Sequence, residues 1–236
     1  MFVDKQTKKV VFVAGASGGI GQAVIEKFEA EGWKTVGFYN SKKPERGAEA
    51  KYYKLDVSNW DSVVGAFEEA FTDMGRVDCL VNCAGIYGYK SLAQYDMDTM
   101  DNVIGINEVG TYLTTKKIAE LMSEGTIVHV SSTAAQVGSS DPIYAGTKAA
   151  VAGFVKSMAK ALAPKIRVNC VAPGVTESGM TKNMNPDRLD QLITLSLLKK
   201  IAEPSDIANG IYFLASDESS HITGSCLDIN GGYVLR

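Results

Sequence analysis

Short apolar runs rich in β-branched residues alternate with helical patterns along nearly the whole chain. The runs are apolar throughout rather than at every second position, which is typical of parallel strands covered on both faces. We expect strands at residues 10–15, 35–40, 50–57, 77–85, 125–132, 166–174 and 225–232, and helices at residues 21–32, 61–75, 111–125 and 144–163. The alternation predicts an α/β fold with a doubly wound parallel sheet of about seven strands and helices on both faces.

One domain accounts for the whole length. The 236 residues, 45% of them apolar, can build one well-buried core but are few for two full domains. We find no linker, repeat or low-complexity tract, so we expect a single domain over residues 1–236. The least regular stretch, residues 175–205, follows a strand end and is long and amphipathic, which predicts a mobile lid. The alternative is a surface helical hairpin that only caps the core.

Charge and composition exclude several classes of protein. The net charge of -3, from 24 basic and 27 acidic side chains, argues against binding nucleic acid or an anionic membrane through bulk charge. No apolar run is long enough to span a membrane, and the first residues lack the features of a signal peptide. The four cysteines match no zinc or redox spacing, and two histidines cannot form a multi-histidine metal centre. We therefore expect a cytoplasmic protein with buried free thiols and no metal.

The first predicted strand runs into a glycine cluster, G-A-S-G-G-I-G at residues 15–21, and then into a helix. Gly15, Gly19 and Gly21 have the spacing G-x-x-x-G-x-G. Glycines let the backbone turn sharply and approach a pyrophosphate, whose charge the helix N-terminus favours. The lysine that a P-loop requires after its glycines is missing. The cluster predicts a Rossmann-type dinucleotide site.

Further motifs follow in order over residues 10–232. They are Asp56-Val57, Asn82-Cys83-Ala84-Gly85, Asn107, Ser131-Ser132, Tyr144 with Lys148 in Y-x-x-x-K spacing, and Pro173-Gly174. Through these motifs and the glycine cluster, the chain resembles the short-chain dehydrogenase/reductase family. The resemblance implies that a nicotinamide cofactor is bound by Gly15, Ser17, Gly19, Ile20, Gly21, Asn40, Asp56, Val57, Asn82, Ala84, Gly85, Tyr144, Lys148, Pro173, Gly174, Val175 and Ser178. It also implies a homotetramer or homodimer.

Tyr144 and Lys148 form a working pair on physical grounds as well. Positions i and i+4 share one helical face, so the ammonium can lie near the phenol. A free tyrosine has a pKa near 10, and an adjacent cation lowers it toward the neutral range. The alternative is a packed tyrosine beside a solvated lysine. The resemblance implies that Tyr144 exchanges a proton with the substrate oxygen, that Lys148 binds the nicotinamide ribose, and that Asn107 holds the helix geometry.

Two neighbouring serines compete for the role of binding the substrate oxygen. The alignment of the S-S-x-A segment favours Ser132, whereas the commonest family spacing from Tyr144 favours Ser131. Alternation along a strand lets only one of them face the site. We expect Ser132, with a one-residue deletion in the loop at residues 138–142. The catalytic set is then Asn107, Ser132, Tyr144 and Lys148.

The end of the second strand bears on the choice of cofactor. Members that prefer NAD typically place an aspartate there, and Tyr39 occupies that position. Without the carboxylate, a 2'-phosphate is no longer repelled, and Asn40, Ser41, Lys42 and Ser17 could surround it. The two lysines at residues 42–43 could equally form a solvated turn, and Gly18 stands where many NADP-using members have arginine. We expect NADP(H), with NAD(H) as the alternative.

The expected activity is the interconversion of a carbonyl and a secondary alcohol by hydride transfer with NAD(P)(H). Reduction of 3-oxoacyl thioesters is the narrowest expectation. However, residues 121–125, L-M-S-E-G, lack the basic cluster that an acidic carrier protein would need. A dehydrogenase for a small alcohol, sugar or dihydrodiol is therefore the alternative within the family. A catalytically silent protein that senses the cofactor is the alternative from another class.

Overall fold

Seven parallel strands form one sheet with the first strand near its middle. The computed structural model describes residues 8–44 and 49–236. The strands are β1 (Val10–Ala14), β2 (Lys34–Tyr39), β3 (Lys51–Lys54), β4 (Cys79–Asn82), β5 (Gly125–Val130), β6 (Ile166–Pro173) and β7 (Cys226–Ile229). Their order is β3, β2, β1, β4, β5, β6, β7, and all neighbours pair in parallel. The predicted doubly wound sheet is confirmed.

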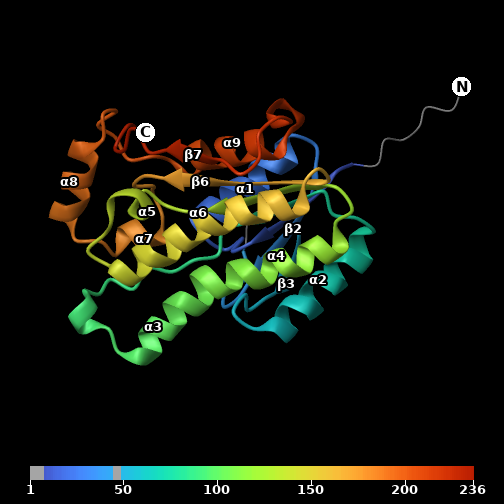
Figure 1. Ribbon diagram of the computed structural model, residues 1–236, viewed down its shortest axis with the longest axis horizontal. Coiled ribbons are helices and arrows are strands. Elements are labelled where there is room, and N and C mark those ends of the chain that lie inside the picture. The colour runs from blue at the N-terminus through green and yellow to red at the C-terminus, as the bar shows by residue number, and fades with distance from the viewer. Residues whose placement is uncertain (1–7, 45–48) are drawn as a thin grey trace, which may run out of the picture.

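Two layers of helices cover the sheet (Figure 1). The helices α1 (Gly19–Ala30) and α9 (Pro204–Ala215) pack on one face. The helices α2 (Trp60–Met74), α4 (Gly110–Leu121) and α6 (Pro142–Leu162) pack on the other. Neighbouring residues of β1 show why the strands are apolar throughout, since Phe12 points into one layer while Val11 and Val13 point into the other.

Shorter elements complete the chain. They are η1 (Leu92–Gln94), α3 (Met97–Ile104), the π turn η2 (Gly105–Val109), α5 (Ala134–Val137), α7 (Gly179–Lys182), α8 (Pro186–Leu195) and η3 (Asp217–Ser219). The predicted lid region thus contains α7 and α8. Within the described ranges, no helix is long and apolar enough to cross a membrane.

The third strand is shorter than the expected span of residues 50–57. Leu55 and Val57 are buried, but they lie beyond the strand. The Val57 side chain packs where α4 begins, because a Cβ on Gly110 would lie only 2.7 Å from Val57 Cγ2. Burial against a helix, rather than pairing in the sheet, therefore explains the apolar pattern at the end of this span.

The four cysteine thiols are free, as expected. Cys79 and Cys170 are buried, whereas Cys83 and Cys226 are only half-buried. Cys170 and Cys226 are direct neighbours in the register of β6 and β7. The expectation of buried thiols therefore holds fully for two of the four.

The loops after β1, β4, β5 and β6 open at the same edge of the sheet, on the left in Figure 1. β1 and β4 are neighbours, with β2 and β3 on one side of the pair and β5 to β7 on the other. The connections that leave β1 and β4 therefore run in opposite directions along the sheet. A crevice at such a reversal is where open α/β sheets bind their ligands.

Candidate active site

The glycine loop brings the ends of β1 and β4 into close contact. Gly15 has φ +77°, and a Cβ there would lie 2.6 Å from the backbone nitrogen of Ala84. A Cβ on Gly21 would lie 2.3 Å from the Gly15 carbonyl oxygen. Only glycine allows both approaches. The loop is therefore built to let backbone, rather than side chains, meet a ligand.

The start of α1 is available to an anion. Gly18 is its N-cap, and within the described chain no side chain caps it and no acidic residue lies in the first turn. The first-turn N–H groups, which include those of Ile20 and Gly21, have no partner within the helix. Such a helix end binds phosphate groups well.

The end of β2 lies beside this loop. The Ala16 N–H donates to the Phe38 carbonyl at 2.9 Å, which places Ser17 next to Tyr39 and the exposed Asn40. No carboxylate occupies the Tyr39 position. The residues that we predicted around a 2'-phosphate thus come from two adjacent loops.

Asp56 and Val57 shape the loop after β3. Asp56 Oδ1 accepts bonds from the Ser58 N–H at 3.0 Å and from the Ser58 hydroxyl at 2.6 Å. The Asp56 N–H donates to the Ser62 hydroxyl at 2.9 Å, which ties the loop to α2. Val57 is buried, so its predicted contact with an adenine would have to come from its backbone or a small exposed part of its side chain.

Asn82 positions the loop after β4. Its side chain is 3% exposed, accepts from the Ala84 N–H at 3.1 Å and donates toward the Thr111 and Thr114 hydroxyls. Asn82 therefore fixes Ala84 and Gly85 against α4. A Cβ on Gly85 would lie 3.2 Å from Lys148 Nζ, so this loop also borders the predicted catalytic lysine.

Asn107 lies in the π turn and clamps the same loop. Its Oδ1 accepts from the Ile86 N–H at 2.8 Å, and its Nδ2 donates to the Ile86 carbonyl at 2.9 Å and to the Thr147 hydroxyl at 3.2 Å. The side chain is fully buried. π turns are frequent at functional sites because they redirect a helical side chain. Here the redirected amide joins the β4 loop to α6.

Tyr144, Ser132 and Lys148 come together where β5 ends and α6 begins. Ser132 lies near Tyr144 and acts to lower the pKa of its phenol. Lys148 Nζ donates to the Val130 carbonyl at 2.9 Å and lies 5.8 Å from the centre of the Tyr144 ring. The i, i+4 spacing thus places both side chains on the site face of α6, as the sequence predicts.

The two serines point in different directions. The Ser131 hydroxyl is buried and donates to the Lys148 carbonyl at 2.8 Å, so it supports the helix backbone. The Ser132 hydroxyl accepts from the Ala134 N–H at 3.1 Å and faces Tyr144. Of the pair, only Ser132 can reach a substrate oxygen beside Tyr144.

Burial favours the neutral forms of the tyrosine and the lysine. It raises the pKa of Tyr144 to about 12, against the opposing effect of Ser132, so the predicted fall of this pKa toward the neutral range is wrong. Tyr87, Asp141 and Tyr89 add to the rise. Burial also lowers the pKa of Lys148 to about 8. At neutral pH the phenol is therefore protonated and can act as a proton donor.

The strand end after β6 closes the far side of the crevice. The Pro173 carbonyl accepts from the Thr133 N–H at 3.1 Å, and the Gly174 N–H donates to the Ile229 carbonyl at 3.0 Å. Ser178 is the N-cap of α7, where its hydroxyl accepts from the Thr181 N–H at 3.4 Å. The hydroxyl can still donate one hydrogen bond to a ligand.

Tyr87 and Tyr89 form an aromatic wall beside Tyr144. The Tyr87 ring centre lies 4.7 Å from that of Tyr144 and 4.8 Å from that of Tyr89. The Tyr89 hydroxyl donates to the Met180 carbonyl at 2.7 Å, and so joins the wall to α7. Met184 and Leu189 are half-buried within the lid region.

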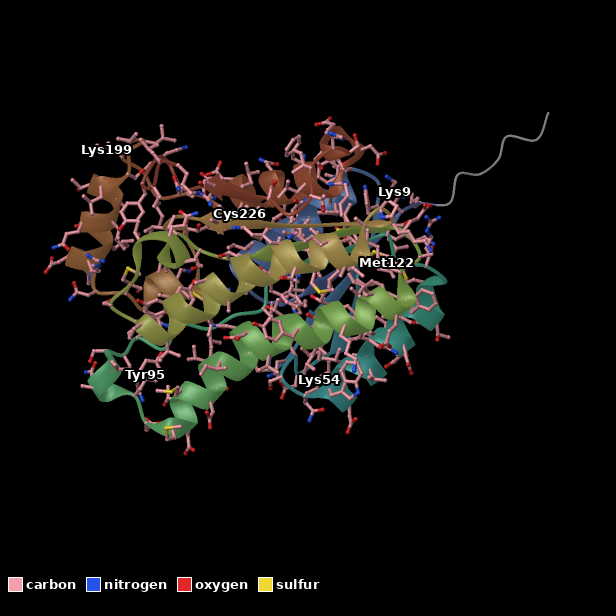
Figure 2. The ribbon with its side chains drawn as sticks, in the orientation of Figure 1. Lys9, Lys54, Tyr95, Met122, Lys199 and Cys226 are labelled. Atoms are coloured by element: carbon pink, nitrogen blue, oxygen red, sulfur yellow. The ribbon has the colours of Figure 1, made fainter. Side chains whose placement is uncertain are left out.

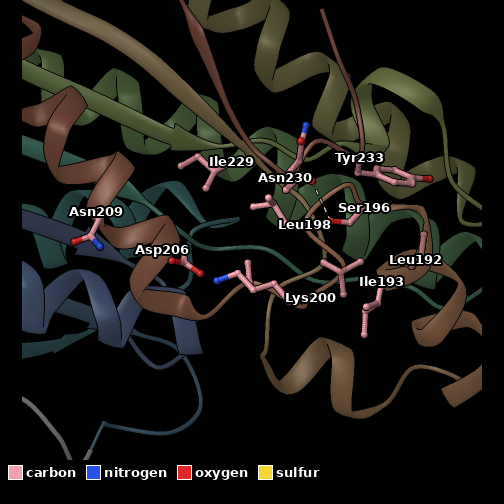
Figure 3. A pocket seen from close by; sticks show the side chains of 13 residues that line it. Leu192, Ile193, Ser196, Leu198, Lys200, Asp206, Asn209, Ile229, Asn230 and Tyr233 are labelled. Carbon is pink, nitrogen blue, oxygen red and sulfur yellow. Dashed lines mark hydrogen bonds between the residues drawn. The ribbon is translucent and has the colours of Figure 1, made fainter.

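A pocket of about 320 Å³ lies behind the lid region, away from Tyr144 (Figure 3). Apolar side chains of α8 and the following turn face the end of β7 there, and the Ser196 hydroxyl donates to the Gly231 carbonyl at 3.0 Å. The lining residues are Val175, Leu192, Ile193, Ser196, Leu198, Lys200, Ala202, Asp206, Asn209, Ile229, Asn230, Gly231 and Tyr233. Since no proposed proton-transfer residue lines it, this pocket is not the reaction centre.

The histidines contribute nothing to this centre. His129 is buried in β5, where burial lowers its pKa to about 3 and its Nε2 lies 3.2 Å from the Thr115 hydroxyl. It is a packed, neutral residue. His221 lies in the turn between η3 and β7.

Three contributors to the site were missed from the sequence. They are the π turn, the Thr147 hydroxyl that accepts from Asn107, and Asp141 at the start of α6. Asp141 carried a usable signal, since an aspartate followed by proline is typical of a helix start. No comparable local pattern marks the π turn.

Comparisons with known proteins identify related enzymes. Residues 15–234 match the family model described as Enoyl-(Acyl carrier protein) reductase. A 3-oxoacyl-acyl-carrier-protein reductase of Thermotoga maritima is 35% identical, over 96% of this chain and 98% of that protein. The corresponding enzyme of Escherichia coli is 33% identical, over 96% of this chain and 98% of its own length.

Solved structures give the same result for the fold. A short-chain dehydrogenase/reductase from Brucella melitensis, titled glucose/ribitol dehydrogenase, has a TM-score of 0.90 at 32% identity and covers 97% of both chains. The aldohexose dehydrogenase of Thermoplasma acidophilum also has a TM-score of 0.90 at 32% identity, over 97% of this chain and 95% of that chain.

Proposed function

This chain belongs to the short-chain dehydrogenase/reductase family, and we propose that it works as a carbonyl reductase in which Tyr144 is the proton donor. It is an oxidoreductase that acts on the CH–OH/C=O pair with NAD(P)(H). The observation that carries the proposal is the convergence of Tyr144, Ser132 and Lys148 at the strand ends beside the glycine loop.

The chain's own residues divide the chemistry as follows. Ser132 and Tyr144 would hydrogen-bond the substrate oxygen, and the protonated phenol would give it a proton as negative charge develops there. The Lys148 ammonium would stabilise the resulting phenolate. Asn107 would keep the β4 loop against α6 and so fix the width of the site.

A nicotinamide cofactor would be held by the cofactor-binding residues predicted from the sequence. The cradle at Gly15, where even a Cβ would clash with Ala84, suits a pyrophosphate that must approach the backbone. The bound cofactor would supply the hydride, transferred between its C4 atom and the substrate carbon. The absence of a carboxylate at Tyr39, with Ser17 and Asn40 close by, supports NADP(H) over NAD(H).

The substrate has two candidates. The names of the curated relatives support a 3-oxoacyl thioester. An acidic carrier protein would need basic side chains after α4, but the exposed residues there are Ser123 and Glu124. This lack of positive charge argues against a substrate bound to a carrier. The second candidate is a sugar or other small alcohol, which is supported by the aromatic wall beside Tyr144 and by the titles of the structural neighbours.

A paired turnover assay tests the function. Purified protein is given NADPH or NADH with β-ketoacyl thioesters, ketones, sugars and dihydrodiols, each in its reacting direction. We expect turnover with one class, and its loss in Tyr144→Phe with cofactor binding retained. Full turnover in that variant would refute the role of Tyr144. NADPH binding with no turnover across the panel would instead favour a cofactor-sensing protein.

We also propose that the chain works in the cytoplasm as a homotetramer or homodimer. The end of α8 and the turn after it expose three large apolar side chains, those of Leu195, Leu197 and Leu198. Leu235, near the C-terminus, is exposed as well. Exposed apolar groups of this kind are typical of interaction surfaces. Light scattering tests the assembly, since a particle near 25.3 kDa at micromolar concentration would contradict it.

A further inference from the structure

Asp141 holds the start of the helix that carries Tyr144. It is the N-cap of α6 and is only 1% exposed. Its Oδ1 accepts a bond from the Tyr144 N–H at 3.0 Å and another from the Tyr95 hydroxyl at 2.8 Å. The carboxylate is therefore bonded directly to the backbone of the residue that we propose as the proton donor.

The second oxygen of this carboxylate is unusual. Among the described residues, Asp141 Oδ2 has no hydrogen-bond partner although it is buried. It lies against the β4 loop, because a Cβ on Gly88 would come within 2.9 Å of it. A neutral cap such as serine or asparagine would satisfy the helix start equally well. The buried negative charge is thus more than the helix end requires.

Tyr95 belongs to the same arrangement. It comes from the segment before α3, at the end of the molecule where α6 begins (Figure 2). Burial and the hydrogen bond to Asp141 raise the pKa of Tyr95, so its hydroxyl remains a donor. One carboxylate thus joins the segment before α3 to the first turn of α6.

The groups that face the Tyr144 phenol come from three parts of the chain. They are Ser132 after β5, Tyr87 and Tyr89 after β4, and Asp141 and Lys148 on α6. Asp141 is the carboxylate among them, and a nearby negative charge disfavours a phenolate. Its effect opposes those of Ser132 and Lys148.

We propose that Asp141 is a positioning residue that fixes Tyr144 at the start of α6 and whose buried charge adds to the effect of burial in favouring the protonated phenol. The inference rests on the proposed function, because it explains how the site would favour donation of a proton to a carbonyl over its removal from an alcohol. In this arrangement Lys148 and Ser132 favour the phenolate after transfer, and the Asp141 charge favours uptake of a proton from solvent by the phenolate before the next turnover.

An NMR titration of the full chain tests this inference without substrate or cofactor. Tyrosine is labelled with ¹³C at the ζ carbon, and the Tyr144 resonance is assigned by its loss in Tyr144→Phe. In Asp141→Asn, which keeps an acceptor for the Tyr144 N–H, we expect phenolate formation to move to lower pH by roughly one pH unit. Asp141→Ser also keeps a capping hydroxyl and should shift it in the same direction.

Tyr95→Phe is the matched control, because it removes the hydroxyl contact but leaves the carboxylate in place. We expect the Tyr144 titration in this variant to stay at the wild-type pH or move higher. A titration unchanged in both Asp141 variants would overturn the inference. So would an equal downward shift in Tyr95→Phe, since packing rather than charge would then be the cause.

Kinetics give a second readout if a substrate is found. The pH at which kcat/KM for alcohol oxidation reaches its plateau should fall in Asp141→Asn by the same amount as in the titration. A protein that turns over no carbonyl compound would refute the proposed function, whereas the titration would still decide the role of Asp141.

Discussion

Exchanging each of two adjacent serines for alanine separates catalysis from stability. Ser132 faces Tyr144, whereas the Ser131 hydroxyl is used by the Lys148 carbonyl. Ser132→Ala removes a hydrogen bond to an oxygen that gains charge during the reaction. The loss of one such donor costs about 10²- to 10³-fold in kcat, or about 3 to 4 kcal/mol. We expect no change in melting temperature beyond about 2 °C.

Ser131→Ala should do the reverse. The variant loses one buried hydrogen bond, worth about 1 kcal/mol in the free energy of unfolding. For a chain of this length that corresponds to a fall of about 2 to 4 °C in melting temperature. The Lys148 side chain keeps its bond to Val130, so kcat should change less than about fivefold.

The two variants are compared by steady-state oxidation of NADPH and by thermal melting under identical conditions. The reasoning fails if Ser131→Ala loses a hundredfold or more in kcat while Ser132→Ala remains active. It also fails if both lose activity in proportion to their loss of stability, because one structural cause would then explain both.

Three further predictions follow from the same geometry. Lys148→Met should abolish turnover but raise the free energy of unfolding at pH 7 by about 2 kcal/mol. Burial lowers the Lys148 pKa to about 8, so keeping the charged lysine buried at pH 7 costs the folded state roughly 3 kcal/mol. The variant avoids this cost but loses the bond to Val130, which is worth about 1 kcal/mol. The wild type should gain stability as pH rises from about 8 to about 10, where the unfolded chain alone still holds the proton, and melting as a function of pH should show this gain missing in the variant. Gly15→Ala should lose NADPH binding in calorimetry and at least 2 kcal/mol of stability, whereas the control Gly32→Ala, with φ +82° but open space around it, should lose only about 1 kcal/mol. Tyr39→Asp should raise the KM for NADPH at least tenfold and lower that for NADH, and an unchanged ratio would contradict the assignment of NADP(H).

The sequence predicts those parts of the fold whose causes are local. Most strands are apolar runs bounded by polar or glycine residues, and Gly75 ends α2 with φ +75° where the sequence places the helix end. The pair Tyr144 and Lys148 is likewise local, because residues four positions apart on a helix share a face.

Other features depend on contacts between distant segments. Asp141 meets Tyr95 and lies against Gly88, some 50 residues earlier in the chain, and no local pattern announces either contact. The Ser178 hydroxyl caps α7 through a bond from the Thr181 N–H, and the family motifs give no sign of this role. β3 ends early because Val57 packs against α4, so an apolar residue was mistaken for a strand residue.

The amide of Asn107 acts on Ile86 as a neighbouring strand would, with one donor and one acceptor paired to the N–H and the carbonyl of the same residue. The loop that carries the aromatic wall is therefore held to the helical layer as well as to α7, which the Tyr89 hydroxyl contacts. Its Ile86 amide proton should exchange with solvent as slowly as one inside the sheet, although it lies in a loop. A movement of α7 away from the wall would have to break the Tyr89 bond to Met180, whereas Asn107 would keep the rest of the loop in place.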